Sequence, residues 1–380
     1  MSSITSVFGD DTATATADAP AKQATFIRRR PIQATMQDPA ATDDKYFTAP
    51  GDLQLVPDPS RRQDVTFDGP LGERIAGHVY APTTGAAPYP AIVLCGPISA
   101  VKEQVVPNYA ERLADAGYLC VTFDPRGFGG SEGPRGLHQP ERTTADFASA
   151  VRYAFTRSDV DTDEISAVGV CMGGGYAVSL GAFEKRLRAI VAVAGGYDIG
   201  GTFTKLMGVK GFAGYQQTIS EAVDAAKQGK SDGRVPTVKA DGLDEDTPIA
   251  VMPNAEAASF YLRTQDSYAP AWSNEFDVAS LEPYLAYKSI ATAAAVAPTP
   301  LMFIHGTTDL FLLPEFAEQA YEAYPAAEGS KEFVWIETHN HIELYDQDPY
   351  VSTAVQHITR WIDEAKAAAE KAAEDDGDDA

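Results

Sequence analysis

Residues 165–177, which read I-S-A-V-G-V-C-M-G-G-G-Y-A, constrain the fold of this chain most strongly. Residues 167–170 are a short apolar run that predicts a strand, Cys171 follows at once, and a helix is expected after three glycines. This order is the context of a nucleophile elbow, where a tight turn strains its central residue and holds that side chain above the sheet. Because strand and helix crowd together there, the residues two before and two after the cysteine must be small. Gly169 and Gly173 hold these places and give the pattern Gly-x-Cys-x-Gly.

Two other interpretations of this stretch stay open. Gly169, Gly173 and Gly175 also suit a phosphate-binding loop between a strand and a helix. The dinucleotide pattern Gly-x-Gly-x-x-Gly is not matched, because Cys171 and Met172 stand where the second glycine is needed. A lone cysteine is also often an inert core residue. The elbow is preferred because partners for it occur downstream.

The rest of the chain alternates strands with helices, which predicts a mostly parallel sheet with right-handed crossovers. Two alternating segments within 64–80 predict an antiparallel hairpin around a turn at 69–72. The further strands are expected at 89–95, 118–124, 167–170, 187–194, 300–305 and 332–337, and the helices at 101–117, at 143–158, from Tyr176, from Pro314 and from Pro349.

The alternation stops between residues 199 and 295, where aromatic residues are frequent. We interpret this segment as a cap inserted into a catalytic domain. The predicted division is a partly disordered N-terminal arm at 1–60, an α/β catalytic domain at 61–198 and 296–368, the cap at 199–295, and an acidic tail at 369–380. Tyr261 and Trp272 of the cap are expected to bind substrate, and the aromatic content favours a largely apolar pocket.

A cysteine nucleophile needs a general base, and the base needs a carboxylate to orient it. Both should follow later strands, in the chain order nucleophile, acid, base. Asp309 lies in the loop G-T-T-D after the strand 300–305, and His341 lies in the loop E-T-H-N-H after the strand 332–337. The sequence therefore predicts Cys171 as nucleophile, Asp309 as acid and His341 as base.

Other residues compete for these roles. His339 lies in the same loop, but His341 directly precedes an apolar segment that can anchor it. His305 ends a strand, and we expect it to be structural. Asp346 and Glu315 are weaker candidates for the acid, because neither directly follows a strand.

An oxyanion needs preorganised N–H donors. Met172 supplies one at the start of a helix, where the helix dipole helps. The other is expected from the loop G-P-I-S-A after the first parallel strand, where Pro97 has no N–H and Ile98 is the best candidate. Lys102 and Glu103 follow, and they either brace this loop or simply begin a helix.

Composition excludes some partners. The formal charge of −24, from 30 basic and 54 acidic residues, disfavours nucleic acid and anionic membranes. No apolar run approaches the roughly 20 residues of a membrane span, and the N-terminus has no hydrophobic stretch typical of a secretory signal. Three cysteines suit a reducing compartment better than a disulfide framework. We expect a cytoplasmic protein, and whether it forms homo-oligomers is left open.

At these residues the chain resembles the α/β-hydrolase superfamily, and within it the dienelactone-hydrolase-like branch, whose nucleophile is a cysteine in G-x-C-x-G. The similarity covers about residues 60–365. It is carried by V-K-E-Q at 101–104, D-P-R-G-F-G-G-S-E-G at 124–133, G-V-C-M-G-G-G-Y-A at 169–177, H-G-T-T-D at 305–309 and H-I-E-L-Y-D at 341–346. The resemblance implies an α/β-hydrolase fold and the same roles for Cys171, Asp309 and His341. The aromatic-rich insertion departs from that branch.

The expected activity is hydrolysis of carboxylic esters, lactones or thioesters through a thioacyl-enzyme, without a metal or an organic cofactor. The expected substrate is a small, largely apolar acyl compound. One alternative is an acyltransferase, in which another nucleophile replaces water. A second is a non-catalytic ligand-binding protein on a hydrolase scaffold.

Overall fold

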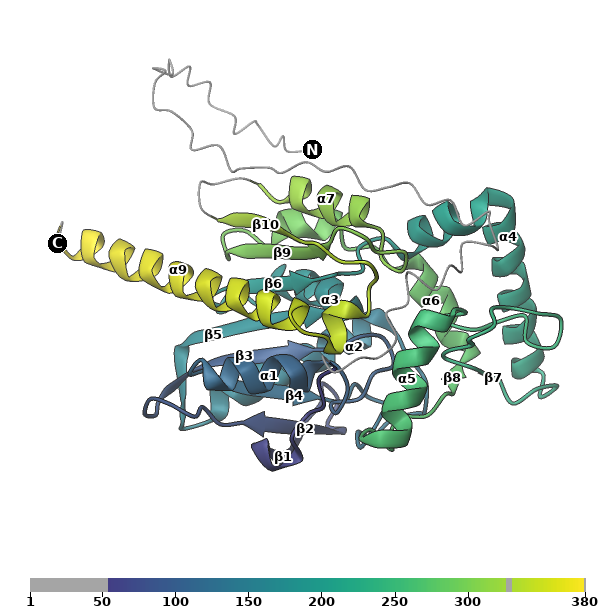
Figure 1. The fold of residues 1–380 in the computed structure, drawn as a ribbon, viewed down its shortest axis with the longest axis horizontal. Coiled ribbons are helices and arrows are strands. Elements are labelled where there is room, and N and C mark those ends of the chain that lie inside the picture. Colours follow the sequence, from purple (N-terminus) through teal and green to yellow (C-terminus); the bar gives the residue numbers. More distant parts are fainter. Residues whose placement is uncertain (1–53, 326–329, 379–380) are drawn as a thin grey trace, which may run out of the picture. The chain divides into compact units, whose positions relative to one another are not determined.

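An eight-stranded sheet in the order β1-β2-β4-β3-β5-β6-β9-β10 runs through the computed structural model, which describes residues 54–325 and 330–378 (Figure 1). β1 and β2 form the predicted antiparallel hairpin, and β2 pairs antiparallel with β4. All later neighbours pair in parallel, so the mostly parallel sheet is confirmed. The strands are β1 (Arg62–Asp68), β2 (Arg74–Tyr80), β3 (Tyr89–Cys95), β4 (Leu119–Phe123), β5 (Val160–Val170), β6 (Ile190–Val193), β9 (Leu301–Gly306) and β10 (Lys331–Ile336).

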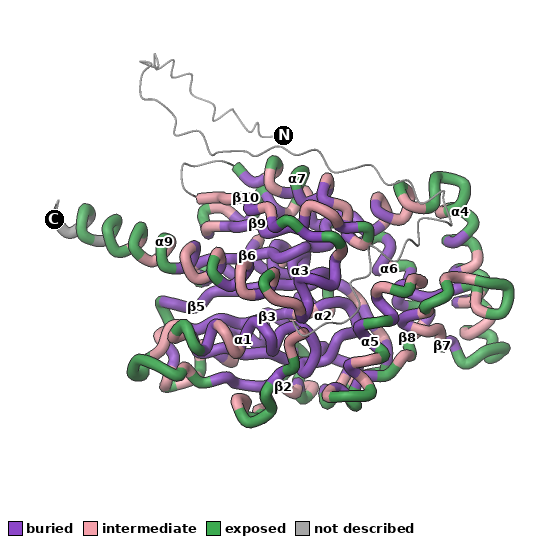
Figure 2. The backbone as a smooth tube through the Cα atoms, in the orientation of Figure 1, coloured by how far each residue is buried: buried purple, intermediate pink, exposed green. Residues whose placement is uncertain are grey.

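The central strands are apolar along their length because helices cover both faces of the sheet. β3 reads Y-P-A-I-V-L-C, a continuous run rather than an alternation, as a strand buried on both faces requires. Val93 and Leu94 point to opposite faces of the sheet, yet both are fully buried. Figure 2 shows the same burial along the neighbouring strands.

The direction of each crossover decides which face a helix covers. The connection from β3 to β4 moves one way along the sheet and the connection from β4 to β5 moves the other way, so right-handed crossovers place α1 and α2 on opposite faces. α1 packs against α9 and lies with it in front of the sheet in Figure 1, while α2 packs against α3. The helices are α1 (Val106–Asp115), α2 (Pro140–Thr156), α3 (Met172–Gly181), α7 (Pro314–Ala323), α8 (Glu343–Asp346) and α9 (Tyr350–Asp378).

The C-terminal helix is longer than predicted. α9 continues beyond residue 368 into the segment predicted as an acidic tail and ends at Asp378. Ala, Glu and Lys, which favour helices, make up residues 369–374 of this stretch. Val351, Ile358 and Trp361 are buried against the fold, whereas the later turns are mostly exposed (Figure 2).

The first helix starts later than predicted. The expected helix 101–117 begins only at Val106, because residues 101–105 form a loop held by side chains. Gln104 Oε1 accepts a hydrogen bond from the Val101 N–H at 3.1 Å, and Val105 has a φ of 62°, outside the right-handed helical region. The alternative in which Lys102 and Glu103 simply begin a helix is therefore wrong.

Residues 199–295 separate β6 from β9 in the chain, although these two strands pair side by side. Figure 1 shows α4, α5 and α6 gathered at one end of the sheet, where the parallel strands have their carboxyl ends. The segment contains α4 (Ile199–Lys227), β7 (Arg234–Val235), α5 (Ala255–Ser267), β8 (Phe276–Asp277), α6 (Leu281–Ala286) and two short 3₁₀ turns. We call it the cap, and the domain boundaries stay a prediction. Most of the predicted N-terminal arm, residues 1–53, lies outside the described residues.

The helices in the described ranges include none with both the length and the apolar character needed to cross a bilayer.

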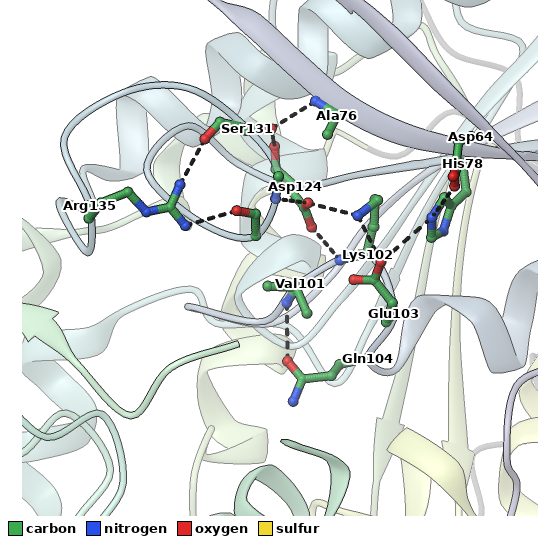
Figure 3. Close-up of polar contacts among 12 residues, drawn as sticks. Asp64, Ala76, His78, Val101, Lys102, Glu103, Gln104, Asp124, Ser131 and Arg135 are labelled. Carbon is green, nitrogen blue, oxygen red and sulfur yellow. Dashed lines mark hydrogen bonds and ion pairs between the residues drawn. The ribbon is translucent and has the colours of Figure 1, made fainter. Parts of the chain in front are cut away.

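A buried polar cluster fixes the loop that follows β3 (Figure 3). Asp124, at the end of β4, accepts hydrogen bonds from the Lys102 N–H at 2.6 Å and the Gly130 N–H at 2.7 Å. Lys102 Nζ lies 3.0 Å from Asp124 Oδ2 and 2.7 Å from Glu103 Oε1. His78 Nε2 completes the cluster at 3.6 Å from the same Glu103 oxygen. The loop therefore has few conformations open to it.

Lys102→Met should lower the free energy of unfolding by roughly 3–5 kcal/mol, because it leaves the Asp124 carboxylate buried without its cation. Urea denaturation followed by circular dichroism measures this loss. The matched control is Lys205→Met, whose partner Glu315 is exposed and whose loss should cost at most about 1 kcal/mol. Equal losses in the two variants would contradict a bracing role for the buried cluster.

Candidate functional site

The predicted elbow is present in the structure. Cys171 lies between β5 and α3 with φ 60° and ψ −128°, a backbone conformation that is costly for a residue with a side chain. A Cβ on Gly169 would overlap the Gly173 carbonyl, and one on Gly173 would overlap the Cys95 carbonyl at the end of β3. The two glycines are thus required by backbone crowding, as the spacing predicts.

The structure brings His341 and Asp309 together at the carboxyl ends of β9 and β10. His341 Nδ1 donates a hydrogen bond to Asp309 Oδ2 at 2.6 Å. The other Asp309 oxygen accepts from the Phe311 and Leu312 N–H groups, both at 2.8 Å, so the carboxylate is fixed on both sides. The ring of Phe311 stacks on His341 with centroids 5.3 Å apart. This leaves His341 Nε2 for the cysteine side of the site.

Electrostatics couple this histidine to its neighbours. Burial alone would lower the pKa of His341, but the neighbouring Asp309 and Cys171 raise that pKa well above its usual value. Burial would likewise raise the pKa of Asp309, and attraction to His341 outweighs it and lowers the pKa. Cys171 is 4% exposed and His341 1%. The arrangement can therefore hold an imidazolium between a carboxylate and the sulfur, out of bulk water.

The competing residues have other partners. The side chain of His339 is 61% exposed and pairs with Glu343 at 3.1 Å. Asp346 pairs with Arg263, and Glu315 pairs with Lys205. His305 is fully buried with its Nδ1 3.2 Å from the Gly306 carbonyl oxygen, in keeping with the structural role expected for it.

The two predicted oxyanion donors lie on adjoining segments. Met172 is the first residue of α3, where an N–H has no acceptor within the helix. Ile98 lies in the loop after β3, which the close packing of Gly173 on Cys95 brings against the elbow. The Ile98 carbonyl accepts a hydrogen bond from the Tyr261 hydroxyl at 3.1 Å. That bond fixes the orientation of one peptide next to the predicted donor.

The two cap residues predicted to bind substrate are packed against each other. The rings of Tyr261 and Trp272 stack with centroids 5.2 Å apart, and both side chains are buried. Tyr261 also interacts electrostatically with Cys171, so it lies at the site, whereas Trp272 supports it. Their contact with substrate stays a prediction.

Sequence reasoning missed how much of the site the cap helix α5 supplies. Glu256 Oε1 accepts the N–H of His341 at 2.8 Å and that of Ile342 at 3.2 Å. Thr264 accepts a hydrogen bond from Gln104 Nε2 at 2.7 Å. These residues lie far apart in sequence, so no local pattern could have paired them.

Sequence reasoning also missed Tyr345. Its hydroxyl lies 3.2 Å from His341 Nε2. The signal was available, because Tyr345 follows His341 by four residues and a short helical turn joins them.

Within 54–325 and 330–378, no three His, Cys, Asp or Glu side chains converge in a way that could hold a metal ion. The absence of a metal or an organic cofactor remains an expectation.

The chain is similar to several known proteins. It is 29% identical over 301 residues to the uncharacterized protein PA2218 of Pseudomonas aeruginosa, covering 74% of this chain and 76% of that protein. It is 26% identical over 273 residues to the acyltransferase drtE of Aspergillus calidoustus, covering 69% of this chain and 82% of that one. A solved structure of DcsB in complex with its substrate analogue matches with a TM-score of 0.68 at 22% identity, covering 80% of this chain and 99% of that chain.

A family model, X-Pro dipeptidyl-peptidase (S15 family), matches residues 68–343. The predicted α/β-hydrolase fold is confirmed, while the narrower dienelactone-hydrolase-like branch stays a prediction. Since the match spans more than half of the chain, this protein belongs to the S15 family and has the α/β-hydrolase fold.

Proposed function

We propose that this protein cleaves carboxylic esters, lactones or thioesters, with Cys171 as nucleophile, His341 as general base and Asp309 as its orienting acid. The observation that carries the proposal is the 2.6 Å hydrogen bond from His341 Nδ1 to Asp309, which turns Nε2 toward a cysteine held at a strained elbow. This is the relation of nucleophile, base and orienting group that activates a weak nucleophile.

In this mechanism the Cys171 proton passes to His341 Nε2, and the thiolate attacks the carbonyl carbon. The N–H groups of Met172 and Ile98 hold the oxyanion. As the tetrahedral intermediate collapses, the leaving group takes the proton from His341 and a thioacyl-enzyme remains. Water then gives a proton to His341 and attacks the same carbon, which releases the acid and restores the thiol.

Acyl transfer is the second candidate. Similarity to the acyltransferase drtE over 82% of that protein favours it, and so does the burial of Cys171, which limits the access of water. Both activities share the thioacyl-enzyme and differ only in the second nucleophile. Product that depends on an added alcohol, thiol or amine, in place of free acid, would identify transfer.

Brief exposure to an activated ester such as p-nitrophenyl acetate should acylate Cys171 and no other residue. Intact-protein mass followed by peptide mapping measures the adduct. Cys171→Ala should keep the fold and lose the adduct together with at least about a thousandfold in kcat, because the covalent route is gone. The matched control is Cys120→Ala, a buried strand cysteine, which should remain active. Full turnover by Cys171→Ala would falsify the mechanism.

His341→Ala should lower kcat by a factor of about 10³ or more, since the thiol loses its base. His339→Ala, two residues away and exposed, should change kcat by less than about threefold. Steady-state kinetics on the same ester give both values. The reverse ranking would mean that the wrong histidine is assigned as base.

Glu256→Gln should make the stability of the protein less dependent on pH. Burial raises the pKa of Glu256 from 4.5 to about 7. A carboxyl group with a raised pKa favours the folded state when protonated, so its contribution to stability falls as pH rises through the window 4.5 to 7.

The thermal midpoint of Glu256→Gln should therefore improve relative to wild type between pH 5 and pH 8, as differential scanning calorimetry measures. The control is Glu282→Gln, an exposed residue of α6, whose difference from wild type should stay constant. If the thermal midpoint of Glu256→Gln differs from that of wild type by the same amount at every pH, the raised pKa of Glu256 is contradicted.

A further inference from the structure

A buried phenol shares the catalytic side of His341. The Tyr345 hydroxyl lies 3.2 Å from His341 Nε2, and both residues interact electrostatically with the Cys171 side chain. The Tyr345 and His341 rings meet edge to face with centroids 5.0 Å apart. Tyr345 is 1% exposed, so the contact is screened from water. The mechanism above gives this hydroxyl no role.

A second phenol holds the first in place. Tyr261, on α5, donates its hydroxyl proton to the Ile98 carbonyl at 3.1 Å and interacts electrostatically with Tyr345. Phe260, next to it on α5, packs edge-on against the Tyr345 ring with centroids 5.0 Å apart. The Tyr345 hydroxyl is therefore held beside the sulfur by Tyr261 and Phe260 of the cap, and Tyr261 is itself fixed by its bond to the Ile98 loop.

The titratable groups around Cys171 leave Tyr345 as a neutral donor. Burial raises the pKa of Tyr345 and of Tyr261 well above the usual value, so both keep their protons near neutral pH. The other titratable neighbours that interact with Cys171 are Tyr176, Tyr284 and Cys95, and burial raises the pKa of each of them as well. Among the titratable side chains around Cys171, His341 is therefore the one that can carry a positive charge.

Assuming the proposed thiol mechanism, we propose that Tyr345 is a further catalytic residue, whose O–H donates a hydrogen bond to the Cys171 sulfur and stabilises the thiolate that forms when the thiol proton moves to His341. The thiol proton moves to His341 Nε2, Tyr345 keeps its own proton, and the sulfur anion then accepts from both groups. A buried anion needs such donors, since it has lost those of water.

The test is the rate at which iodoacetamide alkylates Cys171 in wild type and in Tyr345→Phe, at pH 6.5 and at pH 10. Only the thiolate reacts, so loss of a donor should slow alkylation at pH 6.5 by about tenfold. At pH 10, which is above the ordinary pKa of a free cysteine thiol of about 8.5, the two rates should agree within about twofold. The ratio of the two rates within one variant cancels changes in access to the sulfur. Quantitative mass spectrometry of the peptide that contains Cys171 gives each rate.

Tyr324→Phe is the matched control. Tyr324 is also 1% exposed and donates to the Thr299 carbonyl at 3.0 Å, but Thr299 precedes β9 and so lies at the opposite end of the sheet. The ratio of its Cys171 alkylation rates at pH 10 and pH 6.5 should equal that of wild type. A wild-type ratio in Tyr345→Phe, or equal changes in the two variants, would overturn the proposal.

The test separates this proposal from the proposed function. Absence of an acyl adduct on Cys171 in wild type would reject the nucleophile, while the alkylation ratios would still report on the hydrogen bond. A normal adduct with an unchanged ratio in Tyr345→Phe would reject the role of Tyr345 alone.

Discussion

The rest of the site depends on the strained turn at Cys171. A positive φ at a residue with a side chain costs about 1–3 kcal/mol, and it persists only where the surroundings leave no alternative. Gly169 and Gly173 let β5, α3 and the end of β3 approach until their backbones touch. That contact fixes Cys171 relative to the loop that carries Ile98, so the proposed nucleophile and a proposed oxyanion donor are held by the same backbone contact.

The same loop is fixed from its other side by charge. Lys102, Glu103 and Asp124 are all nearly buried, and each ion has a partner within 3.0 Å. Such a cluster contributes little net stability, because removing ions from water costs about as much as their attraction returns. Its effect is on conformation, since a loop that must keep these partners cannot relax. The Ile98 N–H, which we propose as an oxyanion donor, would be preorganised by this restraint.

The cap is part of the site as well as a cover over it. From α5, Glu256 accepts a hydrogen bond from the His341 N–H, and Tyr261 donates one to the Ile98 carbonyl. Arg263 of the same helix pairs with the buried Asp346, which is next to Tyr345 in the chain. A displacement of α5 would therefore disturb the loop of His341 and the loop of Ile98 together. This coupling explains how a segment inserted between two paired strands can set the geometry of residues outside it.

Features that depend on residues close together in the chain could be predicted from the sequence. The elbow, the hairpin, most strand positions and the loops that hold Asp309 and His341 follow from apolar runs, glycines and chain order. Prediction from the sequence failed where groups far apart in the chain decide the local structure. The segment 101–105 has helical composition but forms a loop, because Asp124 and Gln104 take its N–H groups. Tyr345 stood only four residues from His341, yet its place beside the sulfur depends on Tyr261 and Phe260. The hydrogen bonds between Glu256 and His341 and between Tyr261 and Ile98 span 85 and 163 residues of the chain. Only tertiary packing brings such residues together. Once these polar groups are shielded from water, each must pair with another group of the protein.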